Sequence, residues 1–236
     1  MAKDTIKRES EYEILENPDV LADRLTHGSE DFVKKNRNVL IGLFAVIAAA
    51  IVGGFLYFNY RNTQNTEAQA AMFQAIYYFE ADSLNVALKG DGQYKGLISI
   101  ADQYGSTKAG NLAKFYAGVA LLKQGKYQDA LKYLEDYKSD DLILQGRAYA
   151  LQGDANLELG KKAEAAELYT KAADYKGNEF FSPQYLLKAG MAHELNNNYK
   201  AAVAVYDRII NSYVNAPEVN DAKKYKARAE LLVAGK

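Results

Sequence analysis

Hydrophobic and polar residues divide the 236-residue chain into three stretches with different patterns. Residues 1–38 are mostly polar and charged, and residues 39–60 are almost entirely apolar. Residues 61–236 place apolar positions at the spacing of helices that bury one face. The pattern predicts an all-α protein in which one transmembrane helix precedes a larger helical domain. Abundant Ala, Leu, Lys and Tyr, with only three prolines, favour helix throughout.

The apolar stretch is long enough to cross a bilayer. Val39 to Phe58 carry no charge, and a helix of that length spans about 30 Å, the thickness of the hydrocarbon core. A core helix would show a polar stripe, and a secretory signal peptide would have a shorter apolar region followed by small residues. We therefore expect a permanent anchor over 39–60. Aromatic residues form an interfacial belt at its far end: Phe55, Tyr57, Phe58 and Tyr60.

Basic residues flank this anchor unequally and predict its orientation. Lys34, Lys35 and Arg37 precede it closely, whereas Arg61 alone follows it closely. Because basic flanks stay in the cytoplasm, this cluster is a topology signal, and it also lies where lipid headgroups would be. We expect a bacterial inner-membrane protein with a cytoplasmic N-terminus and residues 61–236 in the periplasm.

The 1–38 tail has little capacity to form a core. Asn17 as a cap and Pro18 as the first helical residue predict a short helix that ends near His27. Its narrow apolar face, against lipid headgroups or a partner, would comprise Leu21, Leu25 and Phe32. A mostly disordered tail with one fraying helix is the alternative.

Three segments of the helical domain repeat one pattern of small and large residues. They begin at Asn111, Gly146 and Pro183, and each reads as two helices separated by a break. Small residues let the paired helices approach closely, and Gly or Asn at the break suits a left-handed helix end. One such hairpin cannot bury its apolar face alone, so several must stack. The aligned positions are Gly118, Gly153 and Gly190; Gly125, Gly160 and Asn197; Ala130, Ala165 and Ala202; and Leu134, Tyr169 and Tyr206.

These segments resemble the tetratricopeptide repeat, a helix–turn–helix unit that stacks into an α-solenoid. Three repeats would occupy 111–216. Lys114 stands where a large apolar residue is usual, Lys162 replaces the Tyr of the other units, and the closing Pro is missing. The flanking segments are expected to be a linker at 61–67, a degenerate hairpin at 68–110 with helices over 68–88 and 92–106, and a capping helix at 217–236.

The sequence offers no convergent set of catalytic residues. His27 and His193 lie far apart, and we expect His193 to be packed inside a repeat. Asp140 and Asp141 are expected to cap a helix rather than to bind a metal. Phosphate loops, zinc-protease motifs, nucleophile elbows and cysteines are absent. With 22 Lys and Arg against 21 Asp and Glu in residues 61–236, a basic face for nucleic acid is also missing. We expect no catalysis, cofactor, metal or small-molecule substrate.

The resemblance implies that the first helix of each repeat lines a partner-binding groove. The groove would be unusually apolar, which suits a partner helix or an unfolded chain. Either it is open, or helix 68–88 or the closing helix fills it. The Lys/Asn/Arg set with which some tetratricopeptide domains grip acidic C-terminal tails is absent. The groove positions are Leu112, Phe115, Val119, Leu122 and Lys123; Arg147, Ala150, Asp154, Leu157 and Glu158; and Gln184, Leu187, Met191, Glu194 and Leu195.

The layout as a whole resembles the YfgM-type proteins, which are ancillary subunits of the SecYEG translocon. The tail ADRLTHGSEDFVKKNRN, the segment RNTQNTEAQAA after the anchor and the stretch QYGSTKAGNLAKFYAG carry this resemblance. It implies that the protein attends exported chains beside the anchored chaperone PpiD, binding without catalysing. A scaffold for another envelope machine (cell wall, division or secretion) is the second hypothesis, and an envelope enzyme that docks through its repeats is the third.

Overall fold

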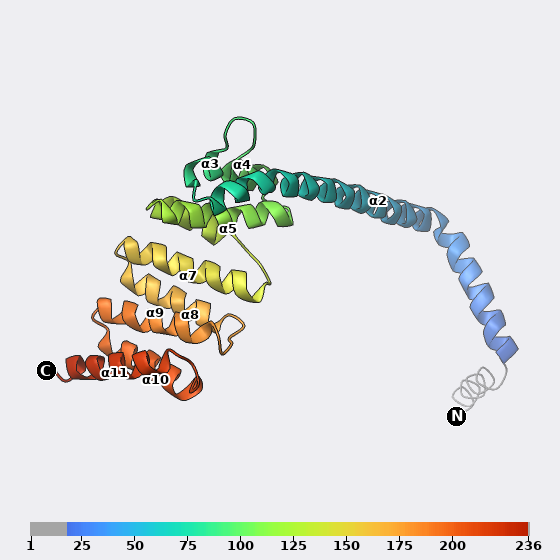
Figure 1. The fold of residues 1–236 in the computed structure, drawn as a ribbon. Helices are drawn as coiled ribbons and strands as arrows, with labels where there is room; N and C mark the ends of the chain where they lie inside the picture. Colours follow the sequence, from blue (N-terminus) through green and yellow to red (C-terminus); the bar gives the residue numbers. More distant parts are fainter. Residues whose placement is uncertain (1–17, 236) are drawn as a thin grey trace, which may run out of the picture. The chain divides into compact units, whose positions relative to one another are not determined.

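The computed structural model describes residues 18–235, and for residues 18–31 it describes the backbone alone. The described residues form ten α-helices and no β-strand, which confirms the all-α prediction (Figure 1). The chain divides into two compact units, Met1–Tyr60 and Arg61–Lys236, and the second is called the helical domain below. The helices are α2 (Pro18–Glu80), α3 (Leu84–Lys89), α4 (Leu97–Tyr104), α5 (Lys108–Lys123), α6 (Tyr127–Asp136), α7 (Leu142–Glu158), α8 (Lys162–Asp174), α9 (Ser182–Leu195), α10 (Tyr199–Ser212) and α11 (Val219–Val233).

Helix α2 is longer than the sequence pattern predicts. It begins at Pro18 but does not end near His27, and residues 61–67, expected as a linker, continue it. Gly28 follows His27, but one glycine costs a helix only about 1 kcal/mol and no proline stands nearby to stop the helix. Asn17 and the side chains of Leu21 and Leu25 lie outside the described part of the chain.

The apolar stretch predicted as an anchor lies within α2. Among the described residues, one helix is long and apolar enough to cross a membrane, Phe32–Glu80. Its most apolar window has a mean hydropathy of 2.7, and none of that window is buried. Length and composition are the basis of this result, and a signal sequence near an N-terminus meets the same criteria.

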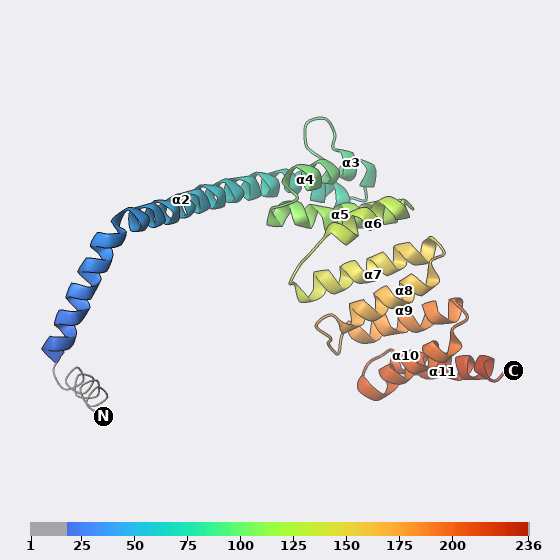
Figure 2. The ribbon, with the colours of Figure 1, turned by 180° about the vertical axis from the view of Figure 1, so that it is seen from behind.

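The helical domain is a row of helical hairpins. Within each hairpin the paired helices contact each other extensively, and each hairpin contacts the next (Figure 1, Figure 2). The last described helix, α11, packs against α10 at the position predicted for a capping helix. The three full hairpins are α5/α6, α7/α8 and α9/α10.

Small residues bring the two helices of each hairpin close together. A Cβ atom added to Gly118 would lie 2.5 Å from the Leu134 side chain. The same atom on Gly190 would lie 2.2 Å from the Tyr206 ring. Side chains at these positions would therefore push the helices apart. The alanines that complete the seam are fully buried: Ala130, Ala165 and Ala202.

The break in each hairpin has the geometry expected from the sequence. Gly125, Gly160 and Asn197 have φ angles of 74°, 77° and 57°, the left-handed region. In the first hairpin the N–H of Gly125 donates to Leu122 O at 3.0 Å, and that of Lys126 donates to Leu121 O at 2.9 Å. Both bonds recur in the other two hairpins, so all three first helices end in the same Schellman-type cap.

The last turns of α2 form the first helix of the degenerate hairpin. They lie parallel to α5, since residues later in α2 contact residues later in α5. Asn65 Oδ1 accepts a hydrogen bond from Ala109 N at 2.9 Å, the rings of Phe79 and Tyr116 lie 5.3 Å apart, and Asp82 pairs with Lys123 at 3.0 Å. Consecutive first helices of stacked hairpins are parallel in this way, so this part of α2 extends the row.

The rest of the degenerate hairpin differs from the sequence expectation. In place of one helix over 68–88, α2 ends at Glu80 and α3 begins at Leu84. Between them Asp82 adopts a φ of 54°, a left-handed conformation that stops the helix. The second helix, expected over 92–106, is the shorter α4, because an antiparallel bridge between Gly90 and Lys95 holds the preceding loop.

Candidate protein-binding surface

Of the polar residues considered for chemistry, Asp141 has a structural role. Asp141 caps α7 as expected: its Oδ1 accepts hydrogen bonds from Leu144 N and Ile143 N, each 2.8 Å long, and these bonds lower the pKa of its carboxyl group. His193 is partly buried in α9, and this burial lowers its pKa, against the opposing charge of Glu167. The described residues contain no group of three or more side chains placed to hold a metal.

In α5, the predicted groove residues lie beside the end of α2. Phe115 is only 5% exposed, and its ring packs 5.3 Å from that of Tyr137, so it contributes to the core. Lys123 pairs with Asp82 and lies over the ring of Phe79. The remaining groove residues of α5 are partly buried against the same apolar cluster: Leu112, Val119 and Leu122.

In α7, the predicted groove residues are mixed. Arg147 and Glu158 are exposed, Leu157 is half-buried, and Ala150 is buried. Asp154 contacts residues of two hairpins.

The carboxylate of Asp154 accepts hydrogen bonds from Tyr169 Oη at 2.6 Å and from Lys188 Nζ at 2.7 Å. Burial, followed by this bond, raises the pKa of Tyr169. Because Lys188 belongs to the next hairpin, Asp154 joins α7 to α9. It therefore has a structural role in addition to any contact with a partner.

In α9, the predicted apolar groove residues form a stripe that is exposed over its second half. Leu187, Met191 and Leu195 are spaced one turn apart; Leu187 is half-buried, and Met191 and Leu195 are 43% and 51% exposed. Glu194, beside them, accepts hydrogen bonds from Tyr206 Oη at 2.7 Å and from Arg228 Nε at 2.9 Å. It thereby links α9 to α10 and α11, and Gln184 is exposed.

A groove lies between the end of α2 and the start of α5, and the sequence pattern did not predict it. It has a volume of about 630 Å³. Phe73 is the most exposed of its large apolar residues, at 78%. The dense apolar pattern AQAAMFQAIYYFE was the available signal, since it holds more apolar residues than one buried face needs. The lining residues from α2 are Gln69, Met72, Phe73, Ile76, Tyr77 and Glu80, and those from α5 are Lys108, Ala109 and Leu112.

A second cavity, also of about 630 Å³, lies between α5 and α7. The sequence pattern did not predict this cavity either. Three tyrosine rings and the connector between α6 and α7 form much of its wall. It shares Lys108 and Leu112 with the first groove, so the two hollows adjoin. Its other lining residues are Asn111, Tyr137, Lys138, Ser139, Asp140, Leu144, Gln145, Tyr149 and Tyr175.

The match to a known family agrees with this geometry. A family model described as "Tetratricopeptide repeat" matches residues 117–180 and, in an overlapping match, residues 150–218. No curated protein matches the sequence. The hairpins α5 to α10 are thus tetratricopeptide repeats, and this class of fold is a protein-interaction module.

Proposed function

We propose that this protein is an ancillary subunit of the bacterial translocon that binds extended apolar segments of exported chains without catalysing a reaction. Residues 39–60 anchor it in the inner membrane, the cluster Lys34, Lys35 and Arg37 keeps the N-terminus in the cytoplasm, and the helical domain works in the periplasm. A PpiD-like chaperone is the expected neighbour.

The apolar surface left exposed on the first helices of the hairpins carries this proposal. Met191 and Leu195 on α9 and the ring of Phe73 on α2 remain exposed in the described chain, and Leu187, one turn before Met191, is half-buried. Exposed apolar patches of this kind are typical of protein-interaction sites. Extended or helical peptides are the partners that such grooves accommodate.

The anchor supports the site of action. Val39 and Phe58 bound an uncharged run whose large side chains are exposed in the described chain, including Ile41, Phe44 and Val46. Such side chains are stable when lipid surrounds them. The proposal therefore places the binding surface close to where chains leave the membrane.

In-cell photocrosslinking tests this function. A photoreactive amino acid replaces Phe73, Leu187 or Met191 in the full chain, and Lys132, which is exposed on the second helix of a hairpin, serves as the matched control position. We expect crosslinks to many exported chains, and to translocon or PpiD-like proteins, from the first three positions only. Crosslinks to one folded envelope protein would instead favour a scaffold, and equal crosslinking from Lys132 would refute a specific binding surface.

A further inference from the structure

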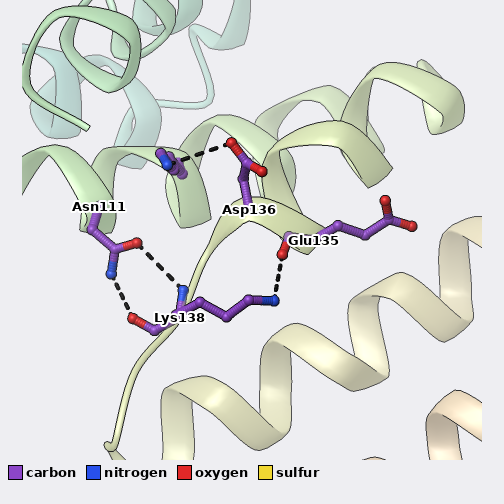
Figure 3. Close-up of polar contacts among 5 residues, drawn as sticks. Asn111, Glu135, Asp136 and Lys138 are labelled. Carbon is purple, nitrogen blue, oxygen red and sulfur yellow. Dashed lines mark hydrogen bonds and ion pairs between the residues drawn. The ribbon is translucent and has the colours of Figure 1, made fainter. Parts of the chain in front are cut away.

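The connector between α6 and α7 forms a fixed wall of the cavity between α5 and α7. The Asn111 amide brackets Lys138, since Asn111 Nδ2 donates to Lys138 O at 2.7 Å and Lys138 N donates to Asn111 Oδ1 at 3.3 Å (Figure 3). Tyr175 Oη donates to Ser139 O at 2.9 Å, and Ser139 N donates to Gln145 Oε1 at 2.6 Å. These four bonds fix the path of the connector along the cavity.

Gln145, which lines the cavity, has half of its amide unpaired. The residue is only 2% exposed, and its Nε2 has no hydrogen-bond partner in the described chain. A rotated amide would bring its nitrogen against the N–H of Ser139, so the donor cannot be exchanged for the acceptor. The other buried glutamine in α7, Gln152, donates to Leu134 O at 2.8 Å. An unpaired buried donor is unfavourable, and an acceptor from a ligand would relieve it.

The other groups around the cavity restrict the ligand. The side chain of Lys108 is exposed at the lining, whereas Lys138 Nζ donates to Glu135 O at 2.6 Å (Figure 3). The rings of Tyr137, Tyr149 and Tyr175 form apolar walls. The cavity therefore offers donors beside aromatic surface. It suits a ligand that presents hydrogen-bond acceptors alongside an apolar group.

The adjoining groove selects an elongated ligand. Because Lys108 and Leu112 line both hollows, a ligand that fills both runs from α7 across α5 to Phe73 on α2. An extended polypeptide fits this path, since it presents a main-chain carbonyl at every residue and side chains on alternate sides about every 3.3 Å.

We propose that the cavity between α5 and α7 binds one apolar side chain of an extended polypeptide, whose adjacent main-chain carbonyl accepts a hydrogen bond from Gln145 Nε2. The inference rests on the proposed function and identifies the residue that would hydrogen-bond to the main chain of the bound polypeptide. Because Nε2 is covered by the surrounding side chains, those side chains move aside as a chain enters, as is common at interfaces.

Peptide binding to substituted proteins tests this role. The full chain is placed in lipid nanodiscs, and the probe is a short fluorescent peptide, acetylated and amidated, with Phe and Leu at alternate positions between Ser residues. Gln145→Met removes the donor, and Gln145→Glu removes it while keeping an oxygen for Ser139 N. We expect both substitutions to weaken binding about tenfold by fluorescence anisotropy. Nanodiscs without protein provide the background.

Gln152→Met is the matched control, because it changes a buried glutamine whose nitrogen is paired within the protein. It should lower the melting temperature and leave peptide affinity unchanged. If Gln145→Met and Gln145→Glu bind as the unsubstituted protein does, the inference is overturned while the proposed function stands. If only a peptide with a free C-terminal carboxylate binds, the cavity recognises the end of a chain and not a main-chain carbonyl, and the inference is also overturned. If no peptide binds and the crosslinks are absent as well, the proposed function fails too.

Discussion

Replacing Gly190 by alanine tests how closely the two helices of a hairpin approach. The new Cβ atom would lie 2.2 Å from Cε1, 2.6 Å from Cζ and 2.9 Å from Cδ1 of Tyr206. The ring cannot easily give way, because it is fully buried and its hydroxyl donates to Glu194 at 2.7 Å. The substitution therefore forces α9 and α10 apart or breaks that bond.

The expected loss follows from two opposing contributions. Overpacking of this kind costs about 1–3 kcal/mol, and alanine in a helix interior regains about 0.5–1 kcal/mol relative to glycine. A net loss of about 1–2 kcal/mol should lower the melting temperature of a domain of this size by roughly 2–8 °C. Thermal scans of the full chain in detergent, followed by far-ultraviolet circular dichroism, measure the shift.

Gly146→Ala is the matched control. This glycine is also buried in a helix, but an added Cβ would meet Ala172 O at 3.5 Å and Tyr185 Cε2 at 3.8 Å, which are ordinary contacts. It should raise the melting temperature slightly. In a Tyr206→Ala background, Gly190→Ala should also cease to destabilise. Equal shifts for Gly190→Ala and Gly146→Ala would refute the reasoning from close approach.

Two further predictions concern the α7 cap and the anchor. Asp141→Ala should lower the melting temperature at neutral pH, whereas Asp140→Ala should change it little, because Asp141 alone of the two accepts the bonds that cap α7. Since the folded-state pKa of Asp141 is lowered, its contribution is fully present above the unfolded pKa of about 3.9 and is lost as pH falls through the folded value. The difference in melting temperature between Asp141→Ala and the unsubstituted protein should thus shrink in thermal scans below that pH. A difference that stays constant with pH would contradict the role of the Asp141 carboxylate as the cap of α7. Ala49→Arg should remove the protein from carbonate-washed membranes, because a charge at the centre of a span costs about 2.5–3.5 kcal/mol, whereas Ala49→Leu should not. Retention of the Ala49→Arg protein in the washed membranes would argue against the anchor.

The features that the sequence predicted well are those set by neighbouring residues. A left-handed helix end requires Gly or Asn, so Gly125, Gly160 and Asn197 could be placed from their spacing alone. Features that depend on residues far apart in the sequence, such as the burial of a side chain by another helix, could not be predicted. Phe115 occupies a groove position in the repeat pattern, but Tyr137, beyond the end of the next helix, packs on its ring and buries it.

The candidate site shows the same division. The stripe of Leu187, Met191 and Leu195 could be predicted from helical spacing, and the exposure of Met191 and Leu195 in the structure is compatible with the binding role proposed for them. Gln145 directly precedes Gly146, the residue at which its repeat begins, and nothing in the repeat pattern marks it. Its unpaired nitrogen results from the bond that Ser139 makes to its oxygen, and that bond depends on the path of the connector.

The segment after the apolar run shows why polar composition alone misidentified a linker. Arg61 donates to the carbonyl of Ser106, Asn65 accepts from Ala109 N at 2.9 Å, and the Tyr104 hydroxyl lies 3.5 Å from a carboxylate oxygen of Glu67. The polar side chains of RNTQNTE thus make hydrogen bonds with backbone and side-chain groups at the turn between α4 and α5. One of these groups is the N–H of Ala109, which has no partner within α5 because it lies in the first turn of that helix. A soluble fragment that began at the predicted domain boundary, Ala68, would lose all three contacts. The helical domain therefore begins at Arg61, directly after the apolar run, and the end of α2 is its first structural element.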